Sequence, residues 1–307
     1  MPRILVGTAQ GLVSFEADAG RRKSALEGHR IGAIAPAGWK RLWAVVDNHE
    51  VWRSDDLDGE WKLVTSIDRR QGTCLADTRA NDESGILIGT SEAHLTRVRD
   101  GRLERVDSFE HAPGREDWYT PWGGPPAVRS ITENREWVFV NVHVGGVLRS
   151  RDGGGTWEPT IDIHADVHRV VTGGGRVYAA GNGGLSVSGD DGDSWELRSR
   201  GLHATYCRSV AVSGEMVLLS ASEGPRGGRA ALYRAAEGAR TLERCRDGLP
   251  EWFDGNIDSL CLDALPDGIL SAFASESGDV FASQDQGASW AQLAQSLRGV
   301  RCLLVLP

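Results

Sequence analysis

SRDGGGTW at residues 150–157 is the first intact copy of a phrase, S-x-D-x-G-x-[ST]-W, that decides the fold of this chain. Two more copies, SGDDGDSW and SQDQGASW, lie at residues 188–195 and 283–290, and a degenerate copy spans residues 54–61. Asp and Gly accept the left-handed backbone of a tight turn, Ser and Asp side chains bond the turn's own amides, and Trp packs under the neighbouring sheet. The phrase predicts a repeated β-hairpin in which its Asp and Trp residues are structural.

The spacing of the copies predicts a propeller. The first two intact copies start 38 residues apart (188 minus 150), and the gaps on either side each hold about two such periods. Repeats of roughly 40 to 50 residues with several short strands are typical of β-propellers. We therefore expect an all-β, seven-bladed β-propeller with four-stranded blades.

The strand pattern also predicts how the ring closes. Blade five is the clearest, with strands expected at 167–172, 176–180, 184–188 and 195–198. The other complete units begin near five positions: Ile31, Gly72, Val128, Cys207 and Ile257.

The two ends of the chain supply the remaining blade. Residues 3–8 read as a second strand and residues 300–305 as an unpaired first strand, so we expect the C-terminal strand to complete blade one within a single 1–307 domain. The one long connection, residues 109–126, is expected to lie over the axial mouth and to be functional.

The phrase resembles the Asp-box of BNR-repeat proteins, a family that includes sialidases, sortilin-type receptors and photosystem-assembly propellers. The resemblance covers the Asp-boxes and the general scaffold. Sialidases carry an Arg-Ile-Pro motif ahead of the first Asp-box, whereas the nearest match here is Arg3-Ile4-Leu5, and they are usually six-bladed. The resemblance thus implies the architecture and carries no motif for sialic acid.

Composition narrows the setting. The net charge of -9 argues against a nucleic-acid backbone as partner. No apolar run is long enough for a membrane helix, and the N-terminus has no secretory pattern. Five cysteines without zinc spacing read as reduced core thiols, so we expect a cytoplasmic protein.

Aligned strand starts predict a polar axial mouth. The seven inner strands superpose ionisable residues from several blades, which should meet near the propeller axis. These aligned positions are Gly32, Thr73, Arg129, His168, Arg208, Asp258 and Arg301. The turns between second and third strands open on the same face and add three reactive residues: Asp47, His143 and Glu276.

Three guanidiniums at one mouth predict a site for a small anion, because Arg offers a planar fork of donors to carboxylate or phosphate. Arg129, Arg208 and Arg301 are similar in this respect to the arginine triad of sialidases. Tyr206 shares a strand face with Arg208, and the resemblance implies a nucleophile role for it, with Glu276 or Asp47 as acid and base. His143, His168 and Asp258 complete the acid–base candidates of a hydrolase or lyase.

A divalent metal is the competing chemistry. His143 and His168 come from neighbouring blades, and Asp166 shares a strand face with His168. Two imidazoles and a carboxylate suit an ion that polarises a substrate or activates water.

Aromatic residues and a non-catalytic alternative stay open. Trp122 in the long connection and Trp252 before blade seven either cover an apolar part of a ligand or cap neighbouring blades. The alternative to an enzyme is a scaffold that holds a protein partner on its surface, as the photosystem-assembly propellers do.

Overall fold

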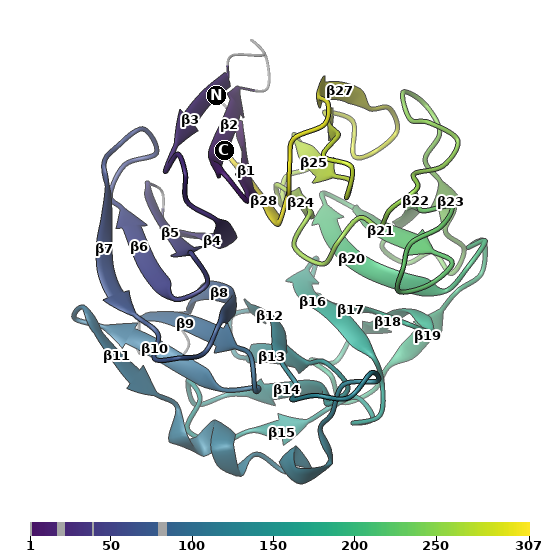
Figure 1. The fold of residues 1–307 in the computed structure, drawn as a ribbon. Helices are drawn as coiled ribbons and strands as arrows, with labels where there is room; N and C mark the ends of the chain where they lie inside the picture. The colour runs from purple at the N-terminus through teal and green to yellow at the C-terminus, as the bar shows by residue number, and fades with distance from the viewer. Residues whose placement is uncertain (1, 17–21, 39, 79–84) are drawn as a thin grey trace.

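The computed structural model describes residues 2–16, 22–38, 40–78 and 85–307. In this described part, 28 strands form seven four-stranded antiparallel sheets, which are arranged as the blades of a ring (Figure 1). The first strand of each sheet lies nearest the centre and the fourth lies at the rim. The predicted seven-bladed propeller is confirmed.

Blade one consists of β28 (Cys302–Leu306), β1 (Arg3–Thr8), β2 (Gly11–Glu16) and β3 (Arg22–Ala25). Blade two contains β4 (Ile31–Ala37), β5 (Arg41–Val46), β6 (Glu50–Ser54) and β7 (Trp61–Ser66). Blade three contains β8 (Gly72–Thr78), β9 (Gly85–Thr90), β10 (Leu95–Arg99) and β11 (Arg102–Arg105). Blade four contains β12 (Val128–Glu133), β13 (Val138–Val142), β14 (Gly146–Ser150) and β15 (Glu158–Pro159).

Blade five contains β16 (Val167–Gly173), β17 (Arg176–Gly181), β18 (Gly184–Ser188) and β19 (Glu196–Arg198). Blade six contains β20 (Tyr206–Ser213), β21 (Met216–Ser222), β22 (Ala231–Ala236) and β23 (Glu243–Arg244). Blade seven contains β24 (Leu262–Ala264), β25 (Ser271–Ala274), β26 (Val280–Ser283) and β27 (Ala291–Ala294). Two 3-10 turns, η2 (Asp107–His111) and η3 (Arg115–Asp117), lie in the long connection between blades three and four.

The C-terminal strand closes the ring as predicted. β28 pairs antiparallel with β1, with Ile4 opposite Val305 and Val6 opposite Leu303. Every residue of β28 is buried, because its side chains fill the cores of blade one and its neighbours. Closure removes a sheet edge and adds apolar burial at the same time.

The Asp-box turns have a repeated local hydrogen-bond pattern. In the first copy, Asp152 Oδ1 accepts the Thr156 amide at 2.8 Å and Asp152 Oδ2 accepts the Thr156 hydroxyl at 2.8 Å. Ser150 Oγ accepts the Gly154 amide at 2.7 Å, and Trp157 is buried. Asp190 and Asp285 repeat these bonds in the second and third copies: these are the turn stabilisers that the sequence predicts.

The inner strands share a β-bulge that explains the alignment of axial residues. Register shifts occur between Ile31 and Ala33, Gly72 and Cys74, Val128 and Ser130, Val167 and Arg169, and Cys207 and Val210. A bulge leaves a residue without a ladder partner and re-aims its side chain. Arg129, His168 and Arg208 all lie at these bulges, so the sequence alignment superposed structurally equivalent positions.

The start of blade seven differs from the prediction. Its inner strand begins at Leu262 rather than near Ile257, because Cys261 N bonds Asp258 O at 2.9 Å and turns the chain. Leu260, within this turn, packs against core clusters of blades one to four. A side chain from blade seven can contact all of these blades only near the axis.

The long connection packs mainly on blades three and four. Phe109 and Trp118 are buried in one core cluster. The ring of Phe109 also contacts the Asp-box residue Trp157 edge-on, with 5.1 Å between the ring centroids. Tyr119 N bonds Val144 O, in the turn between β13 and β14, at 3.2 Å. This bond holds the second half of the connection, from Tyr119 onward, next to the turn between β13 and β14.

No helix in the described residues is long and apolar enough to cross a membrane. The five cysteines all lie in the described part, where they are buried and outside disulfides.

Candidate active site

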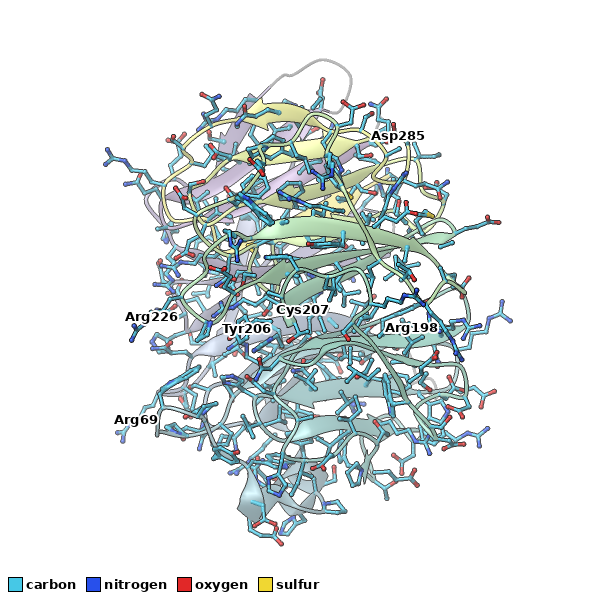
Figure 2. All side chains as sticks on the ribbon, turned by 90° about the vertical axis from the view of Figure 1, so that its right-hand side faces the viewer. Arg69, Arg198, Tyr206, Cys207, Arg226 and Asp285 are labelled. Atoms are coloured by element: carbon cyan, nitrogen blue, oxygen red, sulfur yellow. The ribbon has the colours of Figure 1, made fainter. Side chains whose placement is uncertain are left out.

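Two faces of the ring differ in the turns that they carry. Figure 2 shows Arg69 and Arg226 at one face and Asp285, of an Asp-box, toward the other. We call the first the mouth face: it holds the turns between second and third strands, such as that of Arg226, and the connections between blades, such as that of Arg69. Tyr206, at the start of β20, lies on the same side as Arg226 (Figure 2).

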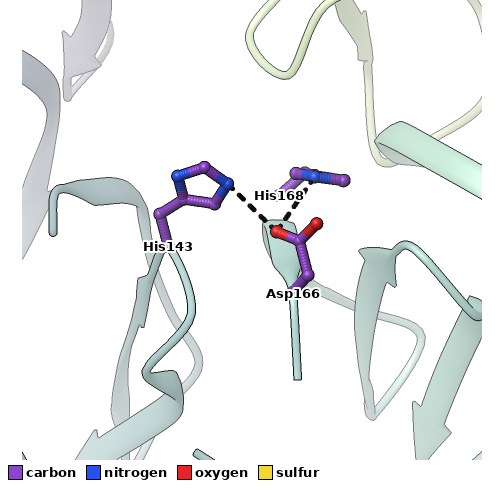
Figure 3. A group of neighbouring side chains, drawn as sticks. All are labelled: His143, Asp166 and His168. Carbon is purple, nitrogen blue, oxygen red and sulfur yellow. Dashed lines mark ion pairs between the residues drawn. The ribbon is translucent and has the colours of Figure 1, made fainter. Parts of the chain in front are cut away.

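His143, Asp166 and His168 meet at this mouth (Figure 3). His143 lies in the turn between β13 and β14, Asp166 directly precedes β16, and His168 is the bulge residue of β16. Asp166 Oδ1 lies 3.0 Å from His143 Nε2 and 3.2 Å from His168 Nε2. All three donor atoms lie within 4.8 Å of one another. The structure therefore brings together the three residues that the sequence proposed as metal ligands.

Backbone and side-chain bonds between blades four and five fix this geometry. His143 N bonds Ala127 O at 2.9 Å, which places the turn against the start of blade four. The buried Asn141 amide bonds Val167 O at 2.8 Å and so joins the two blades directly beneath the site. The relative position of the two histidines thus depends on the packing of adjacent blades.

The three donor atoms are short of hydrogen-bond partners. His143 and His168 are only 2% and 1% exposed. Their Nε2 atoms and Asp166 Oδ1 are shielded from solvent, and none of them has a hydrogen bond of acceptable alignment in the described structure. Buried polar atoms left in this state are costly, so their arrangement calls for a physical explanation.

The tautomer of His168 places a second acceptor next to the Asp166 carboxylate. Its Nδ1 lies 2.7 Å from Cys207 O, and a carbonyl oxygen only accepts, so Nδ1 carries a proton. In the neutral ring Nε2 then holds a lone pair, which faces the carboxylate oxygen of Asp166 at 3.2 Å. Two acceptors this close need a cation between them or a second proton on His168.

The ionisation of the other two residues favours metal binding. Burial is the main influence on the pKa of His143 and lowers it, and the charge of Arg129 acts in the same direction. Burial acts to raise the pKa of Asp166, but the two imidazoles outweigh it and hold that pKa well below its usual range. A neutral imidazole and an ionised carboxylate are the forms that bind metal ions.

Aromatic rings continue on both sides of the histidines. Trp122 lies 4.9 Å from His143 between ring centroids, and Tyr206 lies 4.7 Å from His168. Trp122 is 67% exposed, whereas Tyr206 is buried. The predicted site residues Trp122, His143, His168 and Tyr206 therefore form one row across blades four to six, with the end of the long connection at its rim.

Two of the three predicted arginines gather around one carboxylate. Arg208 Nη1 lies 2.8 Å from Asp258 Oδ1, and its guanidinium lies 5.6 Å from the Tyr206 ring. Arg129 reaches across the axis to Ser259 Oγ of blade seven at 3.3 Å. The Asp258 side chain is 53% exposed, although protein atoms crowd around it. Loss of hydration acts to raise its pKa, but the charges of Arg208 and Arg129 outweigh this effect and lower that pKa.

Arg301 has different surroundings from the other two arginines. It is exposed, and it lies close enough to Arg30 to affect that residue's pKa. Burial is the main cause that lowers the pKa of Arg30, and the positive charge of Arg301 lowers it further. The contacts that join Arg129 and Arg208 to Asp258 do not extend to Arg301.

Asp47 and Glu276 are engaged in positioning loops. Asp47 accepts the Arg30 amide at 2.8 Å and contacts His29 Nδ1 at 2.7 Å. Glu276 accepts the Asn256 amide at 3.1 Å. Each carboxylate therefore holds the connection that precedes an inner strand, which gives it a structural task at the mouth face.

Trp252 has contacts that account for its position without a ligand. The Arg244 guanidinium lies 3.6 Å from its ring, and the His203 ring lies 4.7 Å away. It packs against the core cluster of blades five and six. Of the two readings given by the sequence, this geometry favours the capping one.

Arg169 was missed at the sequence level. It is half-buried and crosses from blade five to blade seven, where its Nη1 bonds Ser259 O at 2.5 Å and Leu262 O at 2.7 Å. All six other blades carry a small residue at the aligned position: Ala33, Cys74, Ser130, Ser209, Ser259 and Cys302. A long Arg among small residues was the available signal, because only such a column leaves room for it.

The donor set fits a divalent ion. Metal-to-ligand bonds of about 2.0 to 2.2 Å at tetrahedral angles place neighbouring donor atoms about 3.3 to 3.6 Å apart, a few tenths of an ångström more than the 3.0 Å and 3.2 Å between Asp166 Oδ1 and the two Nε2 atoms. The bond from His168 Nδ1 to a backbone carbonyl is the support that ligating histidines usually have. Three protein ligands leave a coordination position open for water or substrate.

Comparison with known proteins identifies the fold alone. No family model matches this chain, and no curated protein matches its sequence. It is similar to the GH74 xyloglucanase from Xanthomonas campestris, with a TM-score of 0.68 and 16% identity over 96% of this chain and 52% of that one. It is also similar to a predicted 6-phosphogluconolactonase from Bacteroides uniformis, with a TM-score of 0.67 and 12% identity over 99% of both chains.

A third similar structure is YCF48 bound to D1 peptide, with a TM-score of 0.60 and 14% identity over 92% of this chain and 87% of that one. At 14% and 16% identity, YCF48 and the xyloglucanase show a shared propeller fold and no more than that. Propellers of this shape include enzymes and binding proteins, so function must be argued from the site.

Proposed function

We propose that this protein is a metal-dependent hydrolase that acts on a small anionic substrate at the mouth of the ring. His143, Asp166 and His168 bind a divalent ion, with zinc as the best match to the two nitrogen donors and one carboxylate. The observation that carries the proposal is the convergence of three buried donor atoms that lack aligned hydrogen bonds.

A cation explains this convergence better than protons do. A neutral His168 places a lone pair against Asp166, and burial disfavours a second charged imidazole at His143. A metal ion satisfies all three donors at once and is held by two neutral rings and one anion. It also explains why Oδ1 lies near both Nε2 atoms without hydrogen-bond alignment.

The chemistry follows from the open coordination position. A divalent ion held by His143, Asp166 and His168 would polarise a carbonyl oxygen or activate water at neutral pH. Water adds to the carbonyl carbon of an ester or lactone, the carbon–oxygen bond to the leaving group breaks, and the proton given up by water ends on the departing oxygen. The products are a carboxylate and an alcohol, with release of one further proton to solvent from the acid formed.

Tyr206 is the residue that we assign to proton transfer or to orientation of the leaving group. Its ring contacts His168, and Arg208 lies beside it. Removing the hydroxyl in Tyr206→Phe keeps the buried ring, so we expect bound metal to be retained while kcat falls about 100-fold or more.

Metal analysis of the purified full chain tests the proposal. Protein prepared without an affinity tag rich in histidine is dialysed and analysed by inductively coupled plasma mass spectrometry. We expect roughly one metal ion per chain. His143→Ala and Asp166→Ala are expected to lose it, whereas His164→Ala, an exposed histidine near the same strand, is the matched control and keeps it.

Two outcomes would decide against a metal-dependent enzyme. If neither the protein as purified nor protein titrated with zinc, manganese or cobalt holds metal, acid–base catalysis by His143, His168 and Tyr206 replaces it. If activity on esters and lactones is also absent and a protein partner binds the blade surfaces, the scaffold alternative replaces both.

A further inference from the structure

The two arginines at the mouth have an incomplete set of partners. Arg208 is paired with Asp258, but its Nε is buried without a hydrogen-bond partner. Arg129 bonds Ser259 Oγ at 3.3 Å, and it is in none of the ion pairs found between described residues. Two guanidiniums and one carboxylate leave a charge of one plus (two minus one) at this place.

This charge borders the metal site. Arg129 is the bulge residue of β12, on the same blade as His143, and its charge acts on both His143 and Asp258. Arg208 lies against Tyr206, which contacts His168. These contacts therefore connect the two arginines to the proposed metal ligands, Arg208 through Tyr206 and Arg129 through blade four.

Charge balance indicates which ligand groups suit these residues. A divalent ion paired with Asp166 has a net charge of one plus. The arginine group, which is Arg129 and Arg208 with Asp258, also has a net charge of one plus. A carboxylate matches the second in charge and in planar shape, because guanidinium and carboxylate form paired hydrogen bonds. A phosphate monoester carries about one more negative charge than a carboxylate and exceeds the single positive charge of the arginine group.

Trp122 adds a shape requirement. Its indole is 67% exposed although it contacts His143, so an apolar plane is presented to solvent at the rim of the site. Such a plane packs well against the C–H face of a ring-shaped ligand.

We infer that the substrate is a sugar acid: a cyclic compound with one carboxylate for Arg129 and Arg208, a ring face for Trp122, and an ester or lactone carbonyl within reach of the metal. This inference rests on the proposed function, because the metal provides the second point of attachment. Hydrolysis converts the lactone and one water molecule into a second carboxylate, a hydroxyl group on the opened chain and one proton released to solvent.

A substrate series on the metal-loaded full chain tests the inference. Glucaric acid monolactone carries both a lactone and a carboxylate, gluconolactone lacks the carboxylate, and 6-phosphogluconolactone carries a phosphate instead. We expect kcat/KM for the carboxylate-bearing lactone to exceed that for each of the others at least about tenfold.

Arg129→Gln and Arg226→Gln form a matched pair of variants. Arg226 is an exposed arginine on the same face (Figure 2). Arg129→Gln is expected to raise KM for glucaric acid monolactone about tenfold or more, to leave gluconolactone unaffected and to keep its metal, whereas Arg226→Gln behaves like the wild type.

The outcomes separate this inference from the proposal on which it rests. Equal rates on gluconolactone, or a preference for the phosphate, in protein that holds its metal would overturn the sugar-acid inference alone. Protein without metal would overturn both. The substrate series uses wild-type protein, so it decides the question even if Arg129→Gln fails to fold.

Discussion

The Asp-box turns and the mouth of the ring use the same kinds of residue in opposite ways. Asp152 has its acceptor sites filled by groups within four residues of it in sequence. Asp166 faces two imidazoles from blades four and five, and its Oδ1 has no aligned hydrogen bond. A carboxylate satisfied by its own turn stabilises the fold, whereas one left unsatisfied among distant residues is available for a ligand.

Removing the closing strand should have the largest effect. A chain that ends before Arg298 lacks all of β28, whose five residues are buried against blade one. Loss of this burial and of the ladder bonds should exceed a typical reserve of about 5 to 15 kcal/mol. We expect aggregated or unfolded protein by circular dichroism, while removal of Pro307 alone, which is exposed, is tolerated. A soluble truncated chain with a cooperative melting transition would show that closure is dispensable.

The next largest effect separates buried from exposed tryptophans. Trp290 of the third Asp-box is 5% exposed, so Trp290→Ala should lower the free energy of unfolding by about 3 to 5 kcal/mol. Trp122→Ala, at the rim of the mouth, should change it by less than about 0.5 kcal/mol. Urea denaturation measures both, and metal content of the folded fraction should stay the same in Trp290→Ala. Equal destabilisation by the two changes would remove the distinction between the faces.

Exchanging one carboxylate at each place tests the comparison directly. Asp166→Asn should weaken zinc binding more than about 100-fold in a competition titration, with little loss of stability in the absence of metal. Asp152→Asn should lower the melting temperature and leave zinc affinity unchanged, because its partners are local. The comparison fails if Asp166→Asn behaves as Asp152→Asn does.

Acid should act first on the Asp-box face, with a small effect. Burial acts to raise the pKa of Asp285, but hydrogen bonds from Ser289 and its neighbours outweigh burial and lower that pKa. In the second Asp-box, hydrogen bonds from Ser194 are the main cause that lowers the pKa of Asp190 to about 2. A lowered carboxyl pKa contributes stability above the unfolded value, near 4, and this stability is lost as pH falls through the folded value.

The melting temperature of Asp285→Asn should therefore fall less steeply than that of the wild type between about pH 4 and pH 2. Parallel curves for the two proteins would mean that the Asp285 bonds contribute nothing measurable to acid stability.

The sequence was sufficient for the architecture because the repeated hairpin is a local device. Spacing of the phrases predicted the blades, and an unpaired strand pattern at each end predicted the β1–β28 pairing. The sequence alignment also placed Arg129, His168 and Arg208 at equivalent positions, because each lies at the bulge of its inner strand.

Contacts across the ring were harder to predict. The Arg169 side chain can reach blade seven because small residues stand at the aligned positions of the other blades. Leu260 packs near the axis and therefore lies before β24 rather than within it. Trp252 was proposed for ligand binding, but Arg244 and His203 flank it, and nothing local in the sequence specifies those neighbours. The metal ligands were foreseen as a set, whereas their lack of hydrogen-bond partners is visible only in three dimensions.

Anomalous diffraction from crystals of the full chain grown with zinc measures the central claim most directly. The account predicts an anomalous peak at the mouth, about 2.0 to 2.2 Å from His143 Nε2, His168 Nε2 and an Asp166 oxygen. A map without this peak, in which Asp166 accepts well-aligned hydrogen bonds from both imidazoles, would contradict it.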